Sequence, residues 1–181
     1  MSYVAIENIV ASTNLAEEFD LKRLAEILPD SKCSTDEFPG LVWHFTEPKS
    51  AALLLPNAKV ICTGAKSMEE LNSVIRKITN KINDIGISTK EKTEIKIKNI
   101  IASSNLNKTL YLGSIARNIG LENIEYEPEK FPGLIYKVQN INVVILLFGS
   151  GKIICTGAKE LEDTTRAIDL IKDKLTSIGM L

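Results

Sequence analysis

Apolar residues fill consecutive positions in several short segments of this chain instead of alternating with polar ones. The clearest segments are Ala51–Leu55 and Val143–Phe148, and residues 60–62 and 153–155 follow the same pattern. A strand of an antiparallel sheet with one face in water alternates apolar and polar residues. These segments therefore predict strands that are apolar on both faces.

Two longer segments have the helical period. From Met68 to Ile82, and again from Leu161 to Ile178, apolar residues recur at spacings of three and four, which predicts one apolar stripe per helix. Ser67 can cap the first helix while Glu70 reaches back, and Gly179 ends the second. Further strands are predicted at residues 5–12, 41–46, 59–63, 134–138 and 152–156. Two short helices are predicted at residues 21–28 and 110–119.

Strands joined by short turns, with few helices, indicate an α+β fold with an antiparallel sheet of about ten strands. Two long helices can cover one face of such a sheet, and no segment is left to cover the other. An uncovered apolar face of this size is normally an interaction surface. The alternatives are a sandwich or a face buried in a homodimer.

The chain also contains an internal duplication. Residues 6–15 return as residues 97–106, at an offset of 91, and two further blocks return at an offset of 93. These blocks are Phe-Pro-Gly-Leu at residues 38 and 131, and Cys-Thr-Gly-Ala-Lys at residues 62 and 155. We predict two repeats, residues 1–91 and 92–181, that share one sheet about a pseudo-twofold axis.

The composition limits the class of protein to which this chain can belong. The apolar fraction of 44% and the charged fraction of 25% are typical of a soluble globular protein. The N-terminus lacks a basic-then-apolar signal, and the three cysteines have no Cys-x-x-Cys spacing, so we expect reduced thiols that pack strands in an intracellular protein. With His44 as the single histidine, no metal and no cofactor are expected.

The net charge of the chain is −1. Residues 1–90 carry a net charge of −2, and residues 91–181 carry a net charge of +1. Nucleic-acid-binding proteins usually have a basic excess. Any DNA affinity must therefore depend on where the charges lie and on something besides charge.

Several motifs allow two interpretations. Gly149-Ser150-Gly151-Lys152 lacks the flanking residues of a phosphate-binding loop and favours a hairpin turn. The phenylalanines before Pro39 and Pro132 are core plugs or exposed wedges. Asn8 and Asn99 interrupt apolar strands, so each either faces a ligand or bonds to neighbouring backbone.

Catalysis has little support, because no Ser/His/Asp or Cys/His set recurs in both repeats. A DNA-processing enzyme would need a catalytic acid or base on the uncovered face of the sheet, where we expect only Asn and Thr among the polar residues. The acidic run at Glu122, Glu125, Glu127 and Glu129 is a solvated surface or a docking patch.

The paired Asn-Ile-(Val/Ile)-Ala, Phe-Pro-Gly-Leu and Thr-Gly-Ala-Lys blocks, in this order, resemble the TATA-box-binding protein family over essentially the whole chain. Because the chain starts at its first strand, it is similar to the archaeal type. The resemblance implies a saddle with helices on the convex face, and a concave face that binds the minor groove of an A·T-rich element and bends the DNA. It also implies a non-enzymatic general transcription factor in the cytoplasm, associated with the nucleoid, that recruits transcription factor B and, indirectly, RNA polymerase. The apolar face also allows a homodimer of the DNA-free protein.

The resemblance assigns residues to roles. Glu127 and Glu129 are the expected docking site for transcription factor B, and Leu55 departs from the family's fourth wedging phenylalanine. The expected groove contacts are Asn8, Val10, Leu53, Ile61, Thr63, Asn99, Ile101, Leu146, Ile154 and Thr156. The expected wedges are Phe38, Leu55, Phe131 and Phe148, and the expected phosphate contacts are His44, Lys59, Lys66, Lys137, Lys152 and Lys159.

Overall fold

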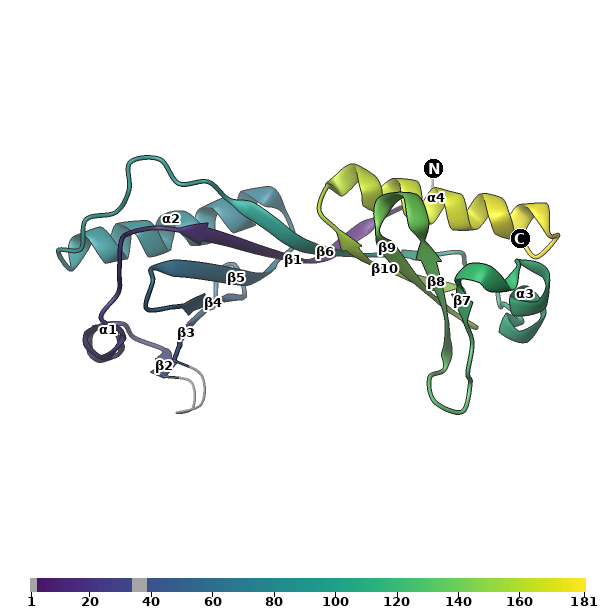
Figure 1. The fold of residues 1–181 in the computed structure, drawn as a ribbon, viewed down its shortest axis with the longest axis horizontal. Coiled ribbons are helices and arrows are strands. Elements are labelled where there is room, and N and C mark those ends of the chain that lie inside the picture. Colours follow the sequence, from purple (N-terminus) through teal and green to yellow (C-terminus); the bar gives the residue numbers. More distant parts are fainter. Residues whose placement is uncertain (1–2, 34–38) are drawn as a thin grey trace. The chain divides into compact units, whose positions relative to one another are not determined.

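The structure is a computed structural model that describes residues 3–33 and 39–181. The chain divides into two compact units (Figure 1). Unit 2 comprises Asn8–Lys98, and unit 1 comprises Met1–Glu7 with Asn99–Leu181.

The strand order in unit 2 is β2-β3-β4-β5-β1, and in unit 1 it is β6-β10-β9-β8-β7. All the strand pairings within each unit are antiparallel. The predicted α+β class with an antiparallel sheet is confirmed. The strands are β1 Ala5–Asn14, β2 Ser31–Cys33, β3 Leu41–Phe45, β4 Ser50–Leu54, β5 Lys59–Ala65, β6 Lys96–Asn105, β7 Ile124–Glu125, β8 Gly133–Val138, β9 Val143–Phe148 and β10 Lys152–Ala158.

Among the residues that the structure describes, each unit has one long and one short α-helix. These are α1 Leu21–Ile27 and α2 Met68–Asp84 in unit 2, and α3 Leu112–Asn118 and α4 Leu161–Ser177 in unit 1, where η1 Leu121–Asn123 and η2 Gln139–Ile141 are short 3₁₀ turns. Helix α2 packs on β5, and α4 packs on β9 and β10 (Figure 1). The predicted stripes form these contacts, with fully buried residues such as Leu71 and Ile78 in α2 and Ile168 and Ile171 in α4.

Buried and half-buried residues alternate along the strands, so the two apolar faces of a strand differ in exposure. In β4, Ala52 and Leu54 are buried against the helix layer, while Ala51 and Leu53 on the opposite side are only half-buried. The same alternation runs through β9. Each unit therefore has one face covered by helices and one apolar face that its own helices leave uncovered, which we call the open face.

Some local details differ from the sequence-based expectation. The edge strands β2 and β7 were not predicted, because segments of three and two residues carry no readable alternation. Cys33 lies exposed on β2, so the expectation that all three cysteines pack strands is wrong for this one. Ser67 caps α2 by accepting a hydrogen bond from the Glu70 amide, as predicted, but the Glu70 carboxylate accepts from the amide of Lys66.

Candidate nucleic-acid interface

The open face of each unit has an apolar centre. In unit 2, Leu53 pairs with Ile61 across β4 and β5, and in unit 1 Leu146 pairs with Ile154 across β9 and β10. Val10 and Ile101, from β1 and β6, are likewise half-buried. All six predicted apolar contacts thus lie on the open face of their unit.

A polar pair interrupts the open face of unit 2. The Nδ2 atom of Asn8 donates to the Oγ1 atom of Thr63 at 3.0 Å, and the Oδ1 atom of Asn8 accepts from the backbone amide of Gly64 at 2.6 Å. Because the Gly64 amide can only donate, this contact fixes which end of the carboxamide is oxygen. One N–H of the Asn8 amide has no partner among these contacts.

Unit 1 repeats this arrangement. Asn99 donates to Thr156 at 3.2 Å and accepts from the amide of Gly157 at 2.7 Å. The alternative in which each asparagine bonds to neighbouring backbone is confirmed for the amide oxygen, and the role of the second N–H as a ligand contact stays a prediction.

The two glycines make this geometry available. Gly64 and Gly157 have φ angles of +103° and +98°, and strand register shifts beside both. A Cβ atom on Gly64 would lie 2.8 Å from the Cα atom of Ser50. This role of the two glycines was not predicted from the sequence, although a glycine inside a strand pattern is a known sign of a bulge.

An aromatic pair lies at one end of the open face of unit 1. The rings of Phe131 and Phe148 meet edge to face with centroids 5.9 Å apart. Gly133 leaves room for them, because its Cβ would lie 2.7 Å from a ring carbon of Phe131 and 3.2 Å from one of Phe148. Phe38, the predicted partner of Leu55 in unit 2, lies outside the described residues; Leu55 itself is half-buried.

The open faces of the two units carry side chains of different size at some equivalent positions. Wherever the apolar residue changes between the described repeats, the smaller one is in unit 2. The pairs are Val10 and Ile101, Val42 and Ile135, Ala51 and Val144, and Leu55 and Phe148.

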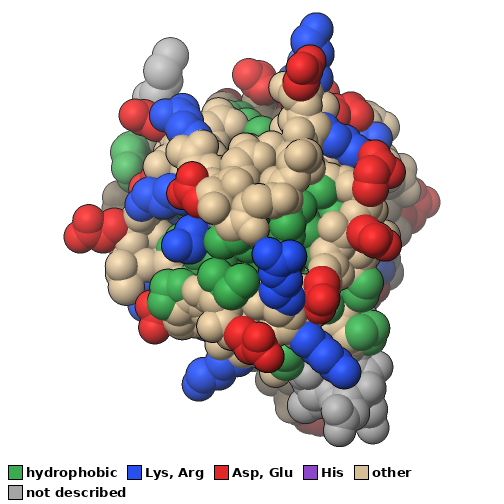
Figure 2. All heavy atoms as spheres, turned by 90° about the vertical axis from the view of Figure 1, so that its left-hand side faces the viewer, with side chains coloured by type: hydrophobic (Ala, Val, Ile, Leu, Met, Phe, Trp, Pro, Cys, Tyr) green, Lys and Arg blue, Asp and Glu red, His purple; other side chains and the backbone are tan. Residues whose placement is uncertain are grey.

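Basic side chains lie around these faces. Lys59 is half-buried, and Lys66, Lys152, Lys159 and His44 are exposed. Lys137 occupies the place equivalent to His44 and forms an ion pair with Glu125, in which both side chains are more than half exposed, so solvent screens the attraction. Figure 2, which views the molecule from the side of α1 and α2, shows positive and negative side chains interspersed around apolar ones rather than a single basic patch.

The acidic run lies on and beside the loop between β7 and β8, which extends beyond the strands in Figure 1. Glu127 and Glu129 are both exposed, and Glu127 forms an ion pair with Lys130. The backbone carbonyl of Glu127 accepts from the amides of Lys130 and Phe131, which makes a tight turn just before the aromatic pair.

The described residues show few other features typical of a catalytic or metal site. Burial raises the pKa of the Cys62 thiol from 9.0 to about 12, and burial together with the charge of Asp163 does the same for Cys155. Within residues 3–33 and 39–181, no group of three or more His, Cys, Asp or Glu side chains could hold a metal ion. No helix in the described part of the chain is long and apolar enough to cross a membrane.

A family model described as transcription factor TFIID, or TATA-binding protein (TBP), matches residues 3–85 and 94–178. The chain belongs to this family. The TATA-box-binding protein of Archaeoglobus fulgidus is 45% identical over 178 residues, covering 98% of this chain and 97% of that protein. The TATA-box-binding protein of Thermoplasma acidophilum is 46% identical over 178 residues, with the same coverage.

Among solved structures, Methanococcus jannaschii TBP superimposes with a TM-score of 0.88 at 42% identity, covering 96% of this chain and 98% of that one. The chain therefore has the TBP fold with its two repeats, and the resemblance read from the three paired motifs is confirmed.

Proposed function

We propose that this chain is a general transcription factor that binds the minor groove of an A·T-rich TATA promoter element and bends the DNA. The observation that carries the proposal is the duplicated asparagine–threonine pair within an apolar open face. The printed names of its relatives, TATA-box-binding proteins, support the same assignment.

The spare N–H of each asparagine and the threonine hydroxyls suit the minor groove of A·T pairs. That groove presents only acceptors, adenine N3 and thymine O2, whereas a G·C pair adds the guanine amino group, which is a donor. Against an apolar face whose fixed polar groups include amide donors, this amino group would lose its water without gaining a partner. The open face thus favours A·T-rich DNA.

Bending follows from the aromatic pair. Apolar side chains that insert between base steps unstack them and kink the duplex, and the TATA-binding protein is itself a standard example of this mode of binding. Phe131 and Phe148 are the wedges of unit 1. Leu55 and Phe38 are the wedges proposed for unit 2.

Phosphate contacts come from Lys59, Lys66, Lys152 and Lys159, with His44 and Lys137 completing the set. Because these cations are few and the net charge is −1, apolar burial against the bent DNA supplies most of the affinity and offsets the free energy that DNA deformation costs.

The exposed Glu127 and Glu129 form the docking site for transcription factor B, through which RNA polymerase is recruited. Their loop extends from unit 1 beside the aromatic pair, so a partner can reach it while DNA occupies the open face. The chain acts by binding, without catalysis.

Fluorescence anisotropy with a TATA-containing duplex and a G·C-rich duplex of equal length tests the proposal. We expect preferential binding to the TATA duplex, with a shallow dependence on salt because few counterions are released. Asn8→Ala should weaken TATA binding about tenfold, and Asn80→Ala, on the exposed side of α2, is the matched control. Equal binding to both duplexes with a steep salt dependence would overturn the proposal, and self-association without DNA binding would favour a dimerising module instead.

A further inference from the structure

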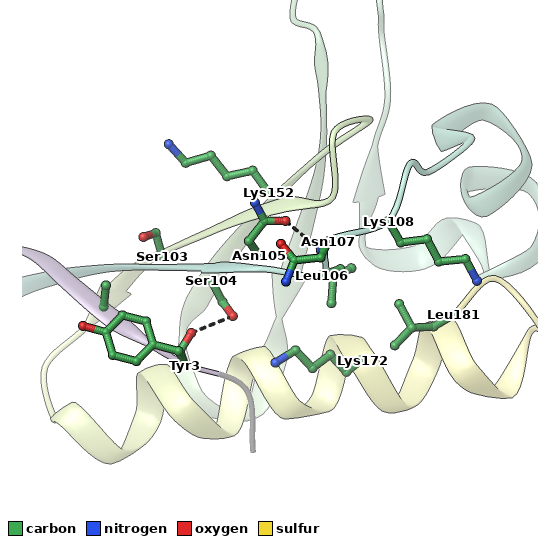
Figure 3. Close-up of a pocket in the computed structure, with 11 residues that line it drawn as sticks. Tyr3, Ser103, Ser104, Asn105, Leu106, Asn107, Lys108, Lys152, Lys172 and Leu181 are labelled. Atoms are coloured by element: carbon green, nitrogen blue, oxygen red, sulfur yellow. Dashed lines mark hydrogen bonds between the residues drawn. The ribbon is translucent and has the colours of Figure 1, made fainter.

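Unit 1 contains a cavity of about 840 Å³, and Lys152 is the one residue among its described lining that is also a proposed DNA contact. Figure 3 shows it between the end of β6, the loop that follows, the start of β10 and helix α4. Three lysines line it, Lys108, Lys152 and Lys172, and the described residues that line it include no Asp or Glu.

The decisive residue is Lys172. Its Nζ atom is buried and has no hydrogen-bond partner, one of two such side-chain atoms in the described part of the chain. Figure 3 shows its side chain extending from α4 along the cavity toward Ser104. A buried ammonium group without a counter-charge is unfavourable, because it has lost its water and gained nothing in return.

The polar groups around Lys172 are already engaged with one another, with one exception. Ser103 donates to the carboxylate of Glu7 at 2.6 Å, and Ser104 donates to the carbonyl of Tyr3 at 3.0 Å. The exception is Asn105, a lining residue whose Oδ1 atom accepts from the Asn107 amide at 2.8 Å and whose Nδ2 group is the remaining donor. The cavity therefore offers donors and positive charge to an external ligand.

The duplicated unit provides a comparison. Its equivalent cavity, about 470 Å³, is lined by Ser12, Thr13, Asn14 and Lys59 in the places of Ser103, Ser104, Asn105 and Lys152. There the counter-charges belong to the chain, because Lys90 pairs with Glu17 and Lys96 with Glu94. The second orphan atom, Thr13 Oγ1, lies there too, but it is uncharged.

Position 172 is Thr79 in the first repeat, where the hydroxyl bonds within α2. The buried ammonium is therefore an addition specific to unit 1, and among the described lining residues nothing neutralises it. Figure 3 also shows the ammonium groups of Lys172 and Lys108 well apart from each other, so a chain of linked anionic groups fits the cavity better than a single ion.

We propose that this cavity is a binding site for a polyphosphate-type anion, held by Lys172 and Lys108. The site goes beyond DNA binding, because α4 lies on the covered face of the sheet. The shared chemistry is that of linked phosphates, which inorganic polyphosphate, a nucleoside triphosphate or a nucleic-acid backbone could each supply.

Isothermal titration of the full chain with inorganic tripolyphosphate tests the site, together with amide chemical-shift mapping. We expect one-to-one binding at this site with shifts centred on residues 103–108, at least tenfold weaker binding of orthophosphate, and at least tenfold weaker binding of tripolyphosphate to Lys172→Met. Lys172→Met should also raise the Tm of the free protein, since it removes an unpaired buried charge. Lys81→Met, the same charge change on α2, should bind as the unaltered chain does.

Lys108→Ser, on an exposed loop, provides a second variant that does not touch the helix, and it should weaken binding several-fold. Unchanged affinity in both Lys172→Met and Lys108→Ser would overturn the proposal. A parallel titration with ATP identifies a nucleotide preference if it binds more tightly than tripolyphosphate. With TATA duplex already bound, tripolyphosphate should still bind; its displacement by the duplex would show that the cavity belongs to the DNA site and would overturn an independent ligand.

Discussion

At the residue scale, the orientation of the two asparagine amides depends on glycine. Gly64 and Gly157 adopt positive φ angles, and their amides hold the Oδ1 atoms of Asn8 and Asn99. These backbone contacts fix the orientation of the Nδ2 group of each asparagine, and no additional side chain is needed. A donor that is fixed before the ligand arrives loses less entropy on binding.

Gly64→Ala tests this arrangement. The substitution combines an unfavourable positive φ with a Cβ that would lie 2.8 Å from the Cα of Ser50, so we expect a loss of about 2–3 kcal/mol of stability, measured by urea denaturation. Gly86→Ala is the matched control, because Gly86 has φ +87° but open space around it. Its cost should stay near 1 kcal/mol. Equal losses in both variants would show that close packing at Gly64 is unimportant.

The buried thiols predict a dependence on alkaline pH. In the folded chain the pKa values of Cys62 and Cys155 are raised from 9.0 to about 12, so above pH 9 the unfolded chain loses these protons first. Stability should therefore be intact below pH 9 and decline toward pH 12, by up to about 1.4 kcal/mol per pH unit for each thiol. Urea midpoints at pH 8 and pH 10.5 should fall less in a Cys62→Ala/Cys155→Ala variant. A decline of the same size in that variant would contradict the assignment.

At the element scale, the β8–β9 hairpin carries an aromatic pair in unit 1, whereas β4 of unit 2 is followed by Leu55. Leucine fills less space than phenylalanine, and the neighbouring open-face residues of unit 2 are smaller as well. The open faces of the two units thus carry side chains of different size.

We expect Phe148→Ala to reduce DNA bending and the lifetime of the complex more than Leu55→Ala does. The larger ring unstacks a base step more effectively and buries more apolar surface. Fluorescence transfer across an end-labelled TATA duplex, with dissociation rates from the same samples, measures both quantities. The reverse order would place the stronger kink at unit 2.

The strands and long helices were predictable because their patterns are strong. Runs such as Val143–Phe148 and the stripe from Met68 to Ile82 admit few alternatives. The short edge strands were not predictable, since two or three residues carry no periodicity. The contacts of Asn8 with Thr63 and Gly64 could not be predicted either. These residues are 55 or more positions apart in the sequence, and the bulge sets the strand register that brings them together.

At the scale of the whole molecule, charges of both signs are distributed without a large excess. The acidic loop between β7 and β8 is present in unit 1, while the equivalent segment of unit 2 overlaps residues outside the described part. If the proposed function holds, we expect this loop and the unequal open faces to set the direction in which the chain lies on the DNA.

Glu127→Lys combined with Glu129→Lys should leave TATA binding within about twofold and weaken capture of transcription factor B about tenfold or more, since charge reversal opposes docking. Gel shifts with and without transcription factor B measure both. Glu17→Lys with Glu18→Lys changes the net charge equally on exposed residues of unit 2 and serves as the control. Loss of DNA binding in the first variant alone would remove the docking assignment.

The first residues of the chain belong to the unit that is completed last. Tyr3 and Glu7 bond to Ser104 and Ser103, and the residues between Asn8 and Lys98 form the other unit. During synthesis, this N-terminal segment leaves the ribosome almost a hundred residues before its partners do. Unit 2 can fold in the meantime, but unit 1 must wait until the chain closes on its own beginning, so removing the first seven residues should disturb the unit that is more distant from them in sequence.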